Sequence, residues 1–323
     1  MNIAFLGAGR IAHVLAKTMV QMEDVTLYAV AARDLDRAKS FAAEYGFARA
    51  YGSYEEMLSD PAVELVYIAT PHSHHFEHMK LCIDHGKAVL CEKSFTLNAS
   101  QARQIAALAR EKGVYVAEAI WTRYMPSRRI INEVLSSGVI GNISTLTCNL
   151  SYPVTYKPRI VRPELAGGAL LDVGIYGLNF ALMHFGDDIL RTDSSVRFTD
   201  TGVDAMETIT LHYRDGKMAV ITAGVLARGD RKGIFYGEKG YIIVENINNP
   251  QSISVYNLTD ELVEKITVPA QISGYEYEIR EAIARIREGH IESASMPLDT
   301  TIAVMERMDN LRKDWGLVYP MEQ

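Results

Sequence analysis

One short stretch near the start of the chain constrains the fold more than any other feature. Residues 7–12 read GAGRIA and directly follow the apolar run Asn2–Leu6, so they fit the pattern G-x-G-x-x-G/A behind a first strand. Gly7 permits a tight turn, Gly9 lets the backbone approach a pyrophosphate, and Ala12 keeps the following helix close to the strand. The N-terminus of that helix presents N–H donors and a partial positive charge to a phosphate. The stretch therefore predicts a dinucleotide site at the start of a strand–helix–strand unit.

The first 120 residues alternate apolar strand patterns with helical patterns. We expect strands at Asn2–Leu6, Val25–Ala32, Val63–Ala69, Ala88–Cys91 and Val114–Glu118. We expect the helices between them at residues 10–22, Leu35–Tyr45, Phe76–His85 and Ala99–Lys112. Wholly apolar strands separated by helices indicate a parallel sheet covered on both faces. Residues 1–120 are therefore predicted to form an α/β domain with a doubly wound parallel sheet, a Rossmann domain that binds NAD(P).

The pattern changes after Glu118, where a helix at Ser127–Ser137 is followed by longer, alternating strands. These strands are expected at Ile143–Tyr152, Ser195–Thr199, Glu207–Tyr213, Lys217–Leu226, Ile234–Tyr236, Tyr241–Glu245, Ser252–Asn257 and Leu262–Val268. The dipeptide Asp215-Gly216 predicts a tight hairpin turn. Residues 121–323 therefore read as an α+β substrate-binding and dimerisation domain with a large, mostly antiparallel open sheet, and a helix at about 300–315 closes the chain.

Bulk composition excludes several classes of function. The chain has 323 residues, 48% of them hydrophobic and 23% charged, which suits two ordinary globular domains. Its net charge of −7 argues against nucleic acid as a partner. No uncharged apolar run approaches the roughly 18 residues of a membrane span, and the N-terminus does not read as a signal peptide. We therefore expect a cytoplasmic protein that does not bind a membrane.

Neither the cysteines nor the histidines predict a metal site. The three cysteines have no CxxC spacing, so they indicate neither a disulfide framework nor zinc. The segment HSHHFEHM at residues 72–79 raises a metal alternative, because imidazoles three or four residues apart can share a divalent ion. That cluster spans a loop and a helix start. We expect solvated or ribose-contacting histidines there and no functional metal.

The end of the second expected strand decides which cofactor is preferred. An NAD-binding protein usually offers a carboxylate there to the ribose hydroxyls. This chain instead reads Ala31-Ala32-Arg33-Asp34. Arg33 can pair with a 2′-phosphate and stack on adenine, so we favour NADP over NAD. Two alternatives stay open: Arg33 as a solvated charge, and Asp34 either as a ribose ligand or as the cap of the helix from Leu35.

Four motifs in order resemble the Gfo/Idh/MocA family of oxidoreductases. They are GAGRIA, TPHSHH, GKAVLCEKS and GGALLDVGIY, and the resemblance covers essentially the whole chain. Within the family, ARDLDRA, AYGSYEEML and EAIWTRYMP look most like the branch with dimeric dihydrodiol dehydrogenase and NADP-dependent D-xylose dehydrogenase. The resemblance implies a Rossmann domain, a second domain whose open sheet forms a homodimer contact or a substrate wall, and a last helix that packs on the first domain.

The resemblance also assigns roles to individual residues. Thr70 and Pro71 match the family segment TPN-x-x-H, with His72 and His75 in its asparagine and histidine positions. Trp121 matches an aromatic residue near the nicotinamide. The expected cofactor-binding residues are therefore Gly7, Gly9, Arg10, Ile11, Ala12, Arg33, Asp34, Thr70, Pro71, His72, His75, Glu92, Lys93 and Trp121.

The expected catalytic residues are Lys93, Tyr176 and Asp172. The first matches the family's EKP motif, and the other two match its D-x-x-x-H/Y pair. Oxidation of a hydroxyl-bearing carbon requires a base for the hydroxyl proton. A tyrosine has a pKa near 10 and needs a nearby cation to act at neutral pH. We assign Tyr176 as acid/base, Lys93 as its activator, and Asp172 as substrate anchor or orienter of Lys93.

Ser94 departs from the family, which usually has proline at this position. A cis bond before serine is disfavoured by roughly 3 kcal/mol, so cost alone predicts a trans bond here. Either the surroundings enforce the family's backbone bend regardless, or Lys93 points differently in this chain.

Three functions remain in competition. The leading one is NADP-dependent hydride transfer between nicotinamide and a hydroxyl-bearing carbon of a sugar or cyclic trans-diol. The second is reduction of an oxo-sugar or another carbonyl or imine substrate. The third is a catalytically silent, cofactor-holding regulator, against which Lys93, Asp172 and Tyr176 together argue.

Overall fold

The computed structural model describes residues 1–322 and divides into two compact units. Unit 1 comprises residues 1–124 and 271–306, and unit 2 comprises residues 125–270 together with the segment from Arg307 onward. The sequence placed residues 271–299 in the second domain. The structure groups them with the first, because the helix α9 (Glu276–Arg287) buries Ile279, Ala282 and Ile283 in the core of unit 1.

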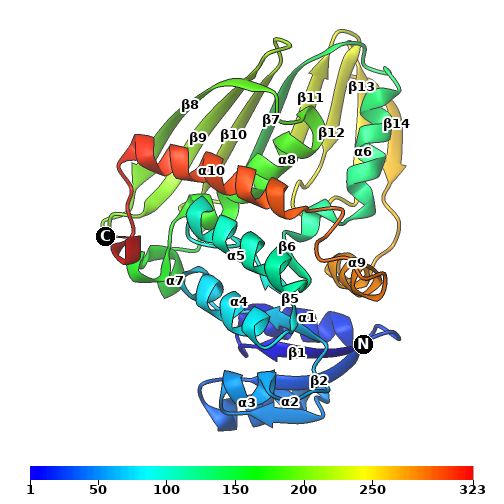
Figure 1. The fold of residues 1–323 in the computed structure, drawn as a ribbon. Helices are drawn as coiled ribbons and strands as arrows, with labels where there is room; N and C mark the ends of the chain where they lie inside the picture. Colours follow the sequence, from blue (N-terminus) through cyan, green and yellow to red (C-terminus); the bar gives the residue numbers. More distant parts are fainter. Residues whose placement is uncertain (323) are drawn as a thin grey trace. The chain divides into compact units, whose positions relative to one another are not determined.

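Unit 1 is built on a sheet of six parallel strands; the parallel arrangement and five of the six strands were predicted. Their order is β3-β2-β1-β4-β5-β6, so successive strands are added on one side of β1 up to β3 and on the other side from β4 onward. Figure 1 labels β1, β2, β5 and β6 of this sheet. The strands are β1 (Asn2–Leu6), β2 (Thr26–Ala31), β3 (Arg49–Tyr51), β4 (Leu65–Ile68), β5 (Ala88–Glu92) and β6 (Val116–Ala119). Ligands of such sheets bind beyond the carboxyl ends of the strands, at the point where the side of addition changes.

The helices of unit 1 begin at recognisable signals. They are α1 (Arg10–Met19), α2 (Leu35–Tyr45), α3 (Tyr54–Leu58), α4 (His75–Asp84), α5 (Ala99–Lys112) and α9. Asp34, Ser53 and Asn98 each cap a helix, because their side chains accept backbone N–H groups of the first turn. The sequence did not predict the short elements β3 and α3, since three and five residues are too few for a periodic pattern.

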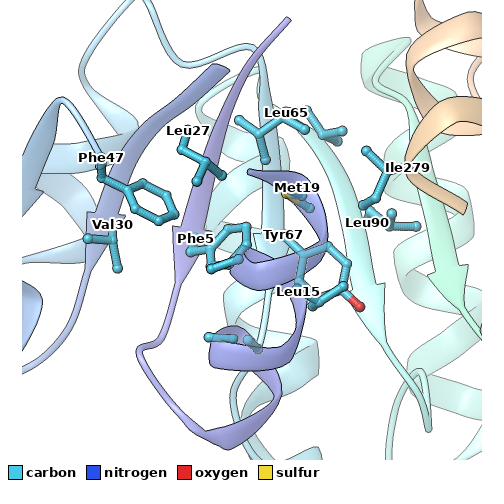
Figure 2. Packing of buried hydrophobic residues seen from close by; sticks show 14 of the residues in the cluster. Phe5, Leu15, Met19, Leu27, Val30, Phe47, Leu65, Tyr67, Leu90 and Ile279 are labelled. Carbon is cyan, nitrogen blue, oxygen red and sulfur yellow. The ribbon is translucent and has the colours of Figure 1, made fainter. Parts of the chain in front are cut away.

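The core of unit 1 lies between the sheet and its helices. Phe5 of β1 packs against Phe47 and Tyr67, with ring centroids 5.2 and 5.8 Å apart (Figure 2). Ile279 of α9 is fully buried in the same cluster as Leu90 of β5. Full burial of an isoleucine side chain contributes about 1.5–3 kcal/mol, which explains why a segment so late in the sequence folds onto the first strands.

Unit 2 is built on a mixed sheet of eight strands. Their order is β14-β13-β12-β11-β7-β10-β9-β8, and every neighbouring pair is antiparallel except β7 with β10 (Figure 1). The strands are β7 (Ile143–Ser151), β8 (Ile189–Phe198), β9 (Asp204–Tyr213), β10 (Met218–Gly224), β11 (Gly233–Gly237), β12 (Gly240–Val244), β13 (Ser252–Asn257) and β14 (Leu262–Thr267). The Asp215-Gly216 turn joins β9 to β10 as predicted.

The helices of unit 2 include one buried apolar stretch. They are α6 (Pro126–Ser136), α7 (Pro158–Val161), α8 (Ile175–Phe185) and the second half of α10 (Leu298–Trp315). The helical stretch Pro163–Phe185 is long and apolar enough to cross a membrane by length and composition alone, but 89% of its apolar window is buried inside the protein. This is the behaviour of a core helix.

Candidate active site

The predicted site residues fall into two groups. Those on unit 1 follow the carboxyl ends of β1, β2, β4, β5 and β6, and parallel strands bring these ends to one edge of the sheet. This group comprises Gly7, Gly9, Arg10, Ile11, Ala12, Arg33, Asp34, Thr70, Pro71, His72, His75, Glu92, Lys93 and Trp121. Asp172 and Tyr176 belong to unit 2.

The glycine turn has the geometry of an anion cradle. Gly7 has φ of 103°, and a Cβ there would lie 3.1 Å from Thr70 Cγ2 and 3.2 Å from the Ala69 carbonyl oxygen. The following helix α1 has Gly9 as its cap, with no capping side chain and no acidic residue in its first turn. Its first N–H groups lack intrahelical partners and carry the positive end of the helix dipole. The turn therefore fits the pyrophosphate of a dinucleotide.

Arg37 supports this turn, although the sequence did not single it out. Its Nε and Nη2 atoms donate to the carbonyl oxygen of Ala8 at 3.1 and 2.7 Å. The guanidinium therefore places a positive charge beside the glycine turn and fixes its backbone. The signal was present in ARDLDRA, where an arginine in the first turn of an exposed helix lies four residues after Arg33.

A cavity of about 220 Å³ lies between the segments that follow β2 and β4. Its lining consists of Arg33, Tyr54, Thr70, Pro71, His74, Glu77 and His78. Burial, with the neighbouring histidines and Arg33, lowers the pKa of His78 to about 4, so that ring is neutral at pH 7. Arg33 is exposed and lies on the wall of this cavity, where the sequence places the adenosine end of the cofactor.

Asp34 acts as a helix cap. Its Oδ1 accepts the backbone N–H groups of Asp36 and Arg37 at 2.9 and 3.2 Å. Of the two roles left open for this residue, the structure shows the cap.

His75 lies beneath the loop that follows β4. It is fully buried, with Nδ1 2.8 Å from the Ser94 carbonyl oxygen and Nε2 2.8 Å from the Thr70 carbonyl oxygen. Burial lowers the pKa of its imidazole to about 4, although the two backbone contacts act in the opposite direction. A neutral ring has one N–H, so it donates to one of these carbonyl oxygens and packs against the other, between the β4 loop and the segment after β5.

The peptide bond between Lys93 and Ser94 is cis, so the expectation of a trans bond drawn from cost alone was wrong. The surroundings hold the segment on both sides of this bond. Ser94 is fully buried with its carbonyl oxygen against His75, and the next residue, Phe95, donates its N–H to Glu118 Oε1 at 3.1 Å. Lys93 is half-buried at the edge of the sheet.

Glu118 and Trp121 complete this edge from β6. Burial raises the pKa of Glu118 to about 7, against the opposing effect of its hydrogen bonds and of the Arg123 and Lys93 charges. Trp121 is 6% exposed and stacks on Tyr275, with ring centroids 4.1 Å apart and an interplanar angle of 6°. No role was predicted for Glu118 or Tyr275: Glu118 opens the EAIWTRYMP segment and ends an expected strand, and Tyr275 belongs to no motif.

In unit 2, Asp172 lies on a π-helical turn, Leu170–Gly174, that leads directly into α8 and Tyr176. The stretch is helical, as the spacing argument required. Arg159 of α7 donates to Asp172 Oδ1 at 2.7 Å and to Oδ2 at 3.5 Å. Both Asp172 and Tyr176 are 8% exposed. The structure thus gives Asp172 a cationic partner from the preceding helix α7.

Two buried acids of β9 lie under this turn and explain its glycines. A Cβ at Gly174 would lie 2.5 Å from Glu207 Oε1, and one at Gly168 would overlap Asp204. Asp204 Oδ2 accepts the N–H of Leu170 at 2.5 Å, and burial raises the pKa of this carboxyl to about 6. Burial, with the Asp204 charge, raises the pKa of Glu207 well above its usual value. The GGALLDVG motif therefore includes glycines that make room for buried carboxyls.

Among residues 1–322, no three His, Cys, Asp or Glu side chains converge in a way that could hold a metal ion. The histidines of residues 72–79 are engaged otherwise. His75 contacts two backbone carbonyls, and His78 Nδ1 lies 3.0 Å from Thr70 Oγ1.

Two family models match most of the chain. Residues 1–119 match the model described as "Oxidoreductase family, NAD-binding Rossmann fold", and residues 129–243 match the GFO/IDH/MocA C-terminal domain. Similar relatives are the trans-1,2-dihydrobenzene-1,2-diol dehydrogenases. The Mus musculus protein is 34% identical over 306 residues, and the Homo sapiens protein is 35% identical over 303; both alignments cover 91% of this chain and 90% of the relative.

A solved structure extends the likeness to the whole fold. A 3-ketoreductase from Actinomadura kijaniata, in complex with TDP-benzene and NADP in an open conformation, has a TM-score of 0.85 and 25% identity. The alignment covers 96% of each chain.

Proposed function

Because this chain belongs to the Gfo/Idh/MocA family of oxidoreductases, we propose that it is an NADP-dependent dehydrogenase that oxidises a hydroxyl-bearing carbon of a cyclic trans-diol or a sugar. The observation that carries the proposal is its likeness, over 91% of its length, to relatives named as dehydrogenases of a cyclic trans-diol. The dinucleotide cradle of unit 1 has the geometry that such an enzyme needs.

Four observations support NADP rather than NAD. Ala32 occupies the position where an NAD-binding protein usually has a carboxylate that binds the ribose hydroxyls. The Oδ1 atom of Asp34 is already hydrogen-bonded as the cap of α2. Arg33 lines the cavity between β2 and β4. Because His78 in the same lining is neutral at pH 7, Arg33 is the positively charged group there that a 2′-phosphate would meet. The similar 3-ketoreductase was solved with NADP. A guanidinium is well suited to a 2′-phosphate, because its planar fork donates two hydrogen bonds to one anion.

The residues divide the work as follows. Residues of the glycine turn, Arg37 and the β4 loop bind and orient the dinucleotide, whose nicotinamide supplies the hydride acceptor. Tyr176 removes the hydroxyl proton as the C–H hydride leaves. Lys93 stabilises the developing alkoxide and favours the ionised phenol. Asp172, paired with Arg159, anchors the substrate hydroxyls.

His75 takes a revised role in this proposal. The family pattern places it among the cofactor contacts, but its ring is buried between two backbone carbonyls. We assign it to positioning the β4 loop and the Lys93 segment, through which it acts on the cofactor.

Turnover on a defined panel tests the function. NADP reduction is followed with trans-dihydrodiols, pentoses and hexoses, and NADPH oxidation with the matching ketones and oxo-sugars. We expect NADP-dependent oxidation of at least one trans-diol or sugar. Tight NADP binding without turnover in either direction contradicts the proposal and favours the silent regulator, and turnover of carbonyl substrates alone favours the reductase.

The partner proposed for the open sheet is a second copy of the chain. Outward-facing apolar side chains on β9, β10 and β11 include Met206, Met218 and Tyr236, each more than a third exposed at 44%, 38% and 38%. Apolar groups on one sheet face favour association by burial.

A further inference from the structure

Three side chains of unit 1 meet below the sheet edge that carries Lys93. The hydroxyl of Tyr67, on β4, lies 2.7 Å from Glu92 Oε1 at the end of β5 and 3.1 Å from Glu278 Oε1 on α9. Tyr67 and Glu278 are fully buried, and Glu92 is 7% exposed. One phenol therefore bridges two buried carboxyl groups.

Counting hydrogens fixes the protonation of this trio. A phenol has one hydrogen, and an ionised carboxylate can only accept. If both acids were ionised, one of them would face the phenol oxygen with no hydrogen between them, in a region with little water to screen the repulsion. One acid therefore keeps a proton and donates it to the Tyr67 oxygen, while Tyr67 donates its own hydrogen to the other acid.

Glu278 is the acid that keeps the proton. Its second oxygen, Oε2, is buried and has no hydrogen-bond partner among residues 1–322, so an ionised form would be poorly compensated. Glu92 lies at the edge of the sheet and directly precedes Lys93. Burial and then the Glu92 charge raise the pKa of Glu278 well above its usual value, against the effect of the Tyr67 hydrogen bond.

The groups around the trio do not reverse this assignment. The phenols are neutral, and burial raises the pKa values of Tyr115, Tyr124 and Cys91 further. Glu281 accepts hydrogen bonds from the segment after α9, including the Ser295 N–H at 3.0 Å. The titratable groups that act on members of the trio are Tyr275 on Tyr67, Cys91 beside Glu92, and Tyr115 and Tyr124 beside Glu278. Glu281 and Arg285 act on Tyr115.

We infer that Tyr67 and Glu278 are positioning residues that leave Glu92 as the single negative charge of a buried trio, next to the catalytic Lys93. A hydrogen bond from Tyr67 stabilises the ionised form of Glu92, and the neutral Glu278 fixes the direction of that phenol hydrogen. The anion then directly precedes Lys93 in the chain. The catalytic consequence rests on the function proposed above, but the protonation of Glu278 does not.

Infrared difference spectroscopy tests the protonation without any substrate. A protonated carboxylic acid has a carbonyl-stretch band separate from that of carboxylates. At pH 7, the spectrum of Glu278→Gln should lack one carboxylic acid band that wild type has. In Tyr67→Phe the same band should shift, because the Glu278 acid loses the phenol oxygen that accepts its hydrogen bond. Full retention of the band in Glu278→Gln, or an unshifted band in Tyr67→Phe, overturns the inference.

Glu276 supplies a matched control on the same helix. It is also buried, but it accepts three backbone N–H groups, two of them at 2.7 Å. Burial raises its pKa, yet these hydrogen bonds leave the pKa below its usual value. Glu276→Gln should therefore remove no acid band, and loss of an equal band there would contradict the assignment to Glu278.

Infrared titration of the Glu92 carboxylate tests the effect on Glu92, with Glu92→Gln used to identify its band. A hydrogen bond to a charged group is lost in Tyr67→Phe, so this carboxylate should take up its proton about one to two pH units higher than in wild type. Glu278→Gln should keep the wild-type midpoint, because its amide donates where the acid did. An unmoved midpoint in Tyr67→Phe overturns the positioning role. If no substrate is turned over, the proposed function fails while the infrared result still decides the protonation.

Discussion

Replacement of Arg33 by alanine is the sharpest test of cofactor choice. NADP and NAD differ only by the phosphate on the adenosine 2′-oxygen, so the ratio of their dissociation constants isolates what the protein does with that group. Arg33 is the only arginine or lysine that lines the cavity between β2 and β4 within residues 1–322. Its loss should therefore affect NADP far more than NAD.

The magnitude follows from the exposure of the side chain. A hydrogen bond to a charged group contributes about 1.5–3 kcal/mol when water is excluded. Because Arg33 is exposed, the lower end applies, and about 1.5 kcal/mol corresponds to roughly a tenfold change in affinity. Loss of stacking on adenine adds about 0.5–1 kcal/mol to both cofactors and cancels in the ratio. We expect the NADP/NAD preference to fall by about tenfold.

Titration calorimetry or quenching of tryptophan fluorescence measures both dissociation constants for each variant. Lys39→Ala is the matched control, because Lys39 is a nearby cation on α2, the helix that follows Arg33. Its side chain is 61% exposed and pairs only loosely with Asp36 at 3.8 Å. The effect of Arg33→Ala should shrink at high salt, since exposed charges are screened. Equal weakening of NAD and NADP, or the same change in Lys39→Ala, refutes the phosphate pairing.

Three further changes test other parts of the molecule. Tyr176→Phe should lower turnover by at least about 100-fold with NADP affinity unchanged, as for loss of an acid/base; retained turnover removes Tyr176 from the mechanism. His75 has a folded pKa depressed to about 4, so its stabilising contribution is complete above the unfolded value and is lost as pH falls from about 6.5 to about 4. In urea unfolding, the free energy of unfolding of wild type should fall by up to about 3 kcal/mol relative to that of His75→Gln over this pH window. Parallel plots of unfolding free energy against pH for the two proteins would contradict this. Met206→Lys should convert the expected dimer to monomer in ultracentrifugation, whereas Val20→Lys, at an exposed site of unit 1, should not; a monomeric wild type refutes the dimer.

Local patterns made the frame of unit 1 predictable. The glycine turn and the alternation of apolar strands with helices both depend on short-range geometry, and the parallel sheet follows from them. The Asp215-Gly216 hairpin was predictable for the same reason, because the turn requires residues that tolerate positive φ; Gly216 has φ of 88°.

The cis bond before Ser94 was not predictable, because local preference and tertiary surroundings disagree there. Serine favours trans, whereas His75 from α4 and Glu118 from β6 hold the flanking backbone in place. The return of α9 to unit 1 was missed for a similar reason. Its amphipathic pattern shows that one face is buried, but not which core receives it.

The charge state of the site edge lies furthest from what a sequence can show. Glu92 and Lys93 directly follow an apolar strand, where a buried charge is costly unless it meets a partner. The charge of Glu92 depends on Tyr67 and on Glu278, which is 211 residues away from Tyr67 along the chain. A buried carboxyl is stable as an anion only where donors reach it, and as an acid only where an acceptor takes its proton. The Tyr67 hydroxyl donates to Glu92 and accepts from Glu278, so this one group keeps Glu92 ionised and Glu278 protonated. The three side chains come together only in the folded arrangement of β4, β5 and α9.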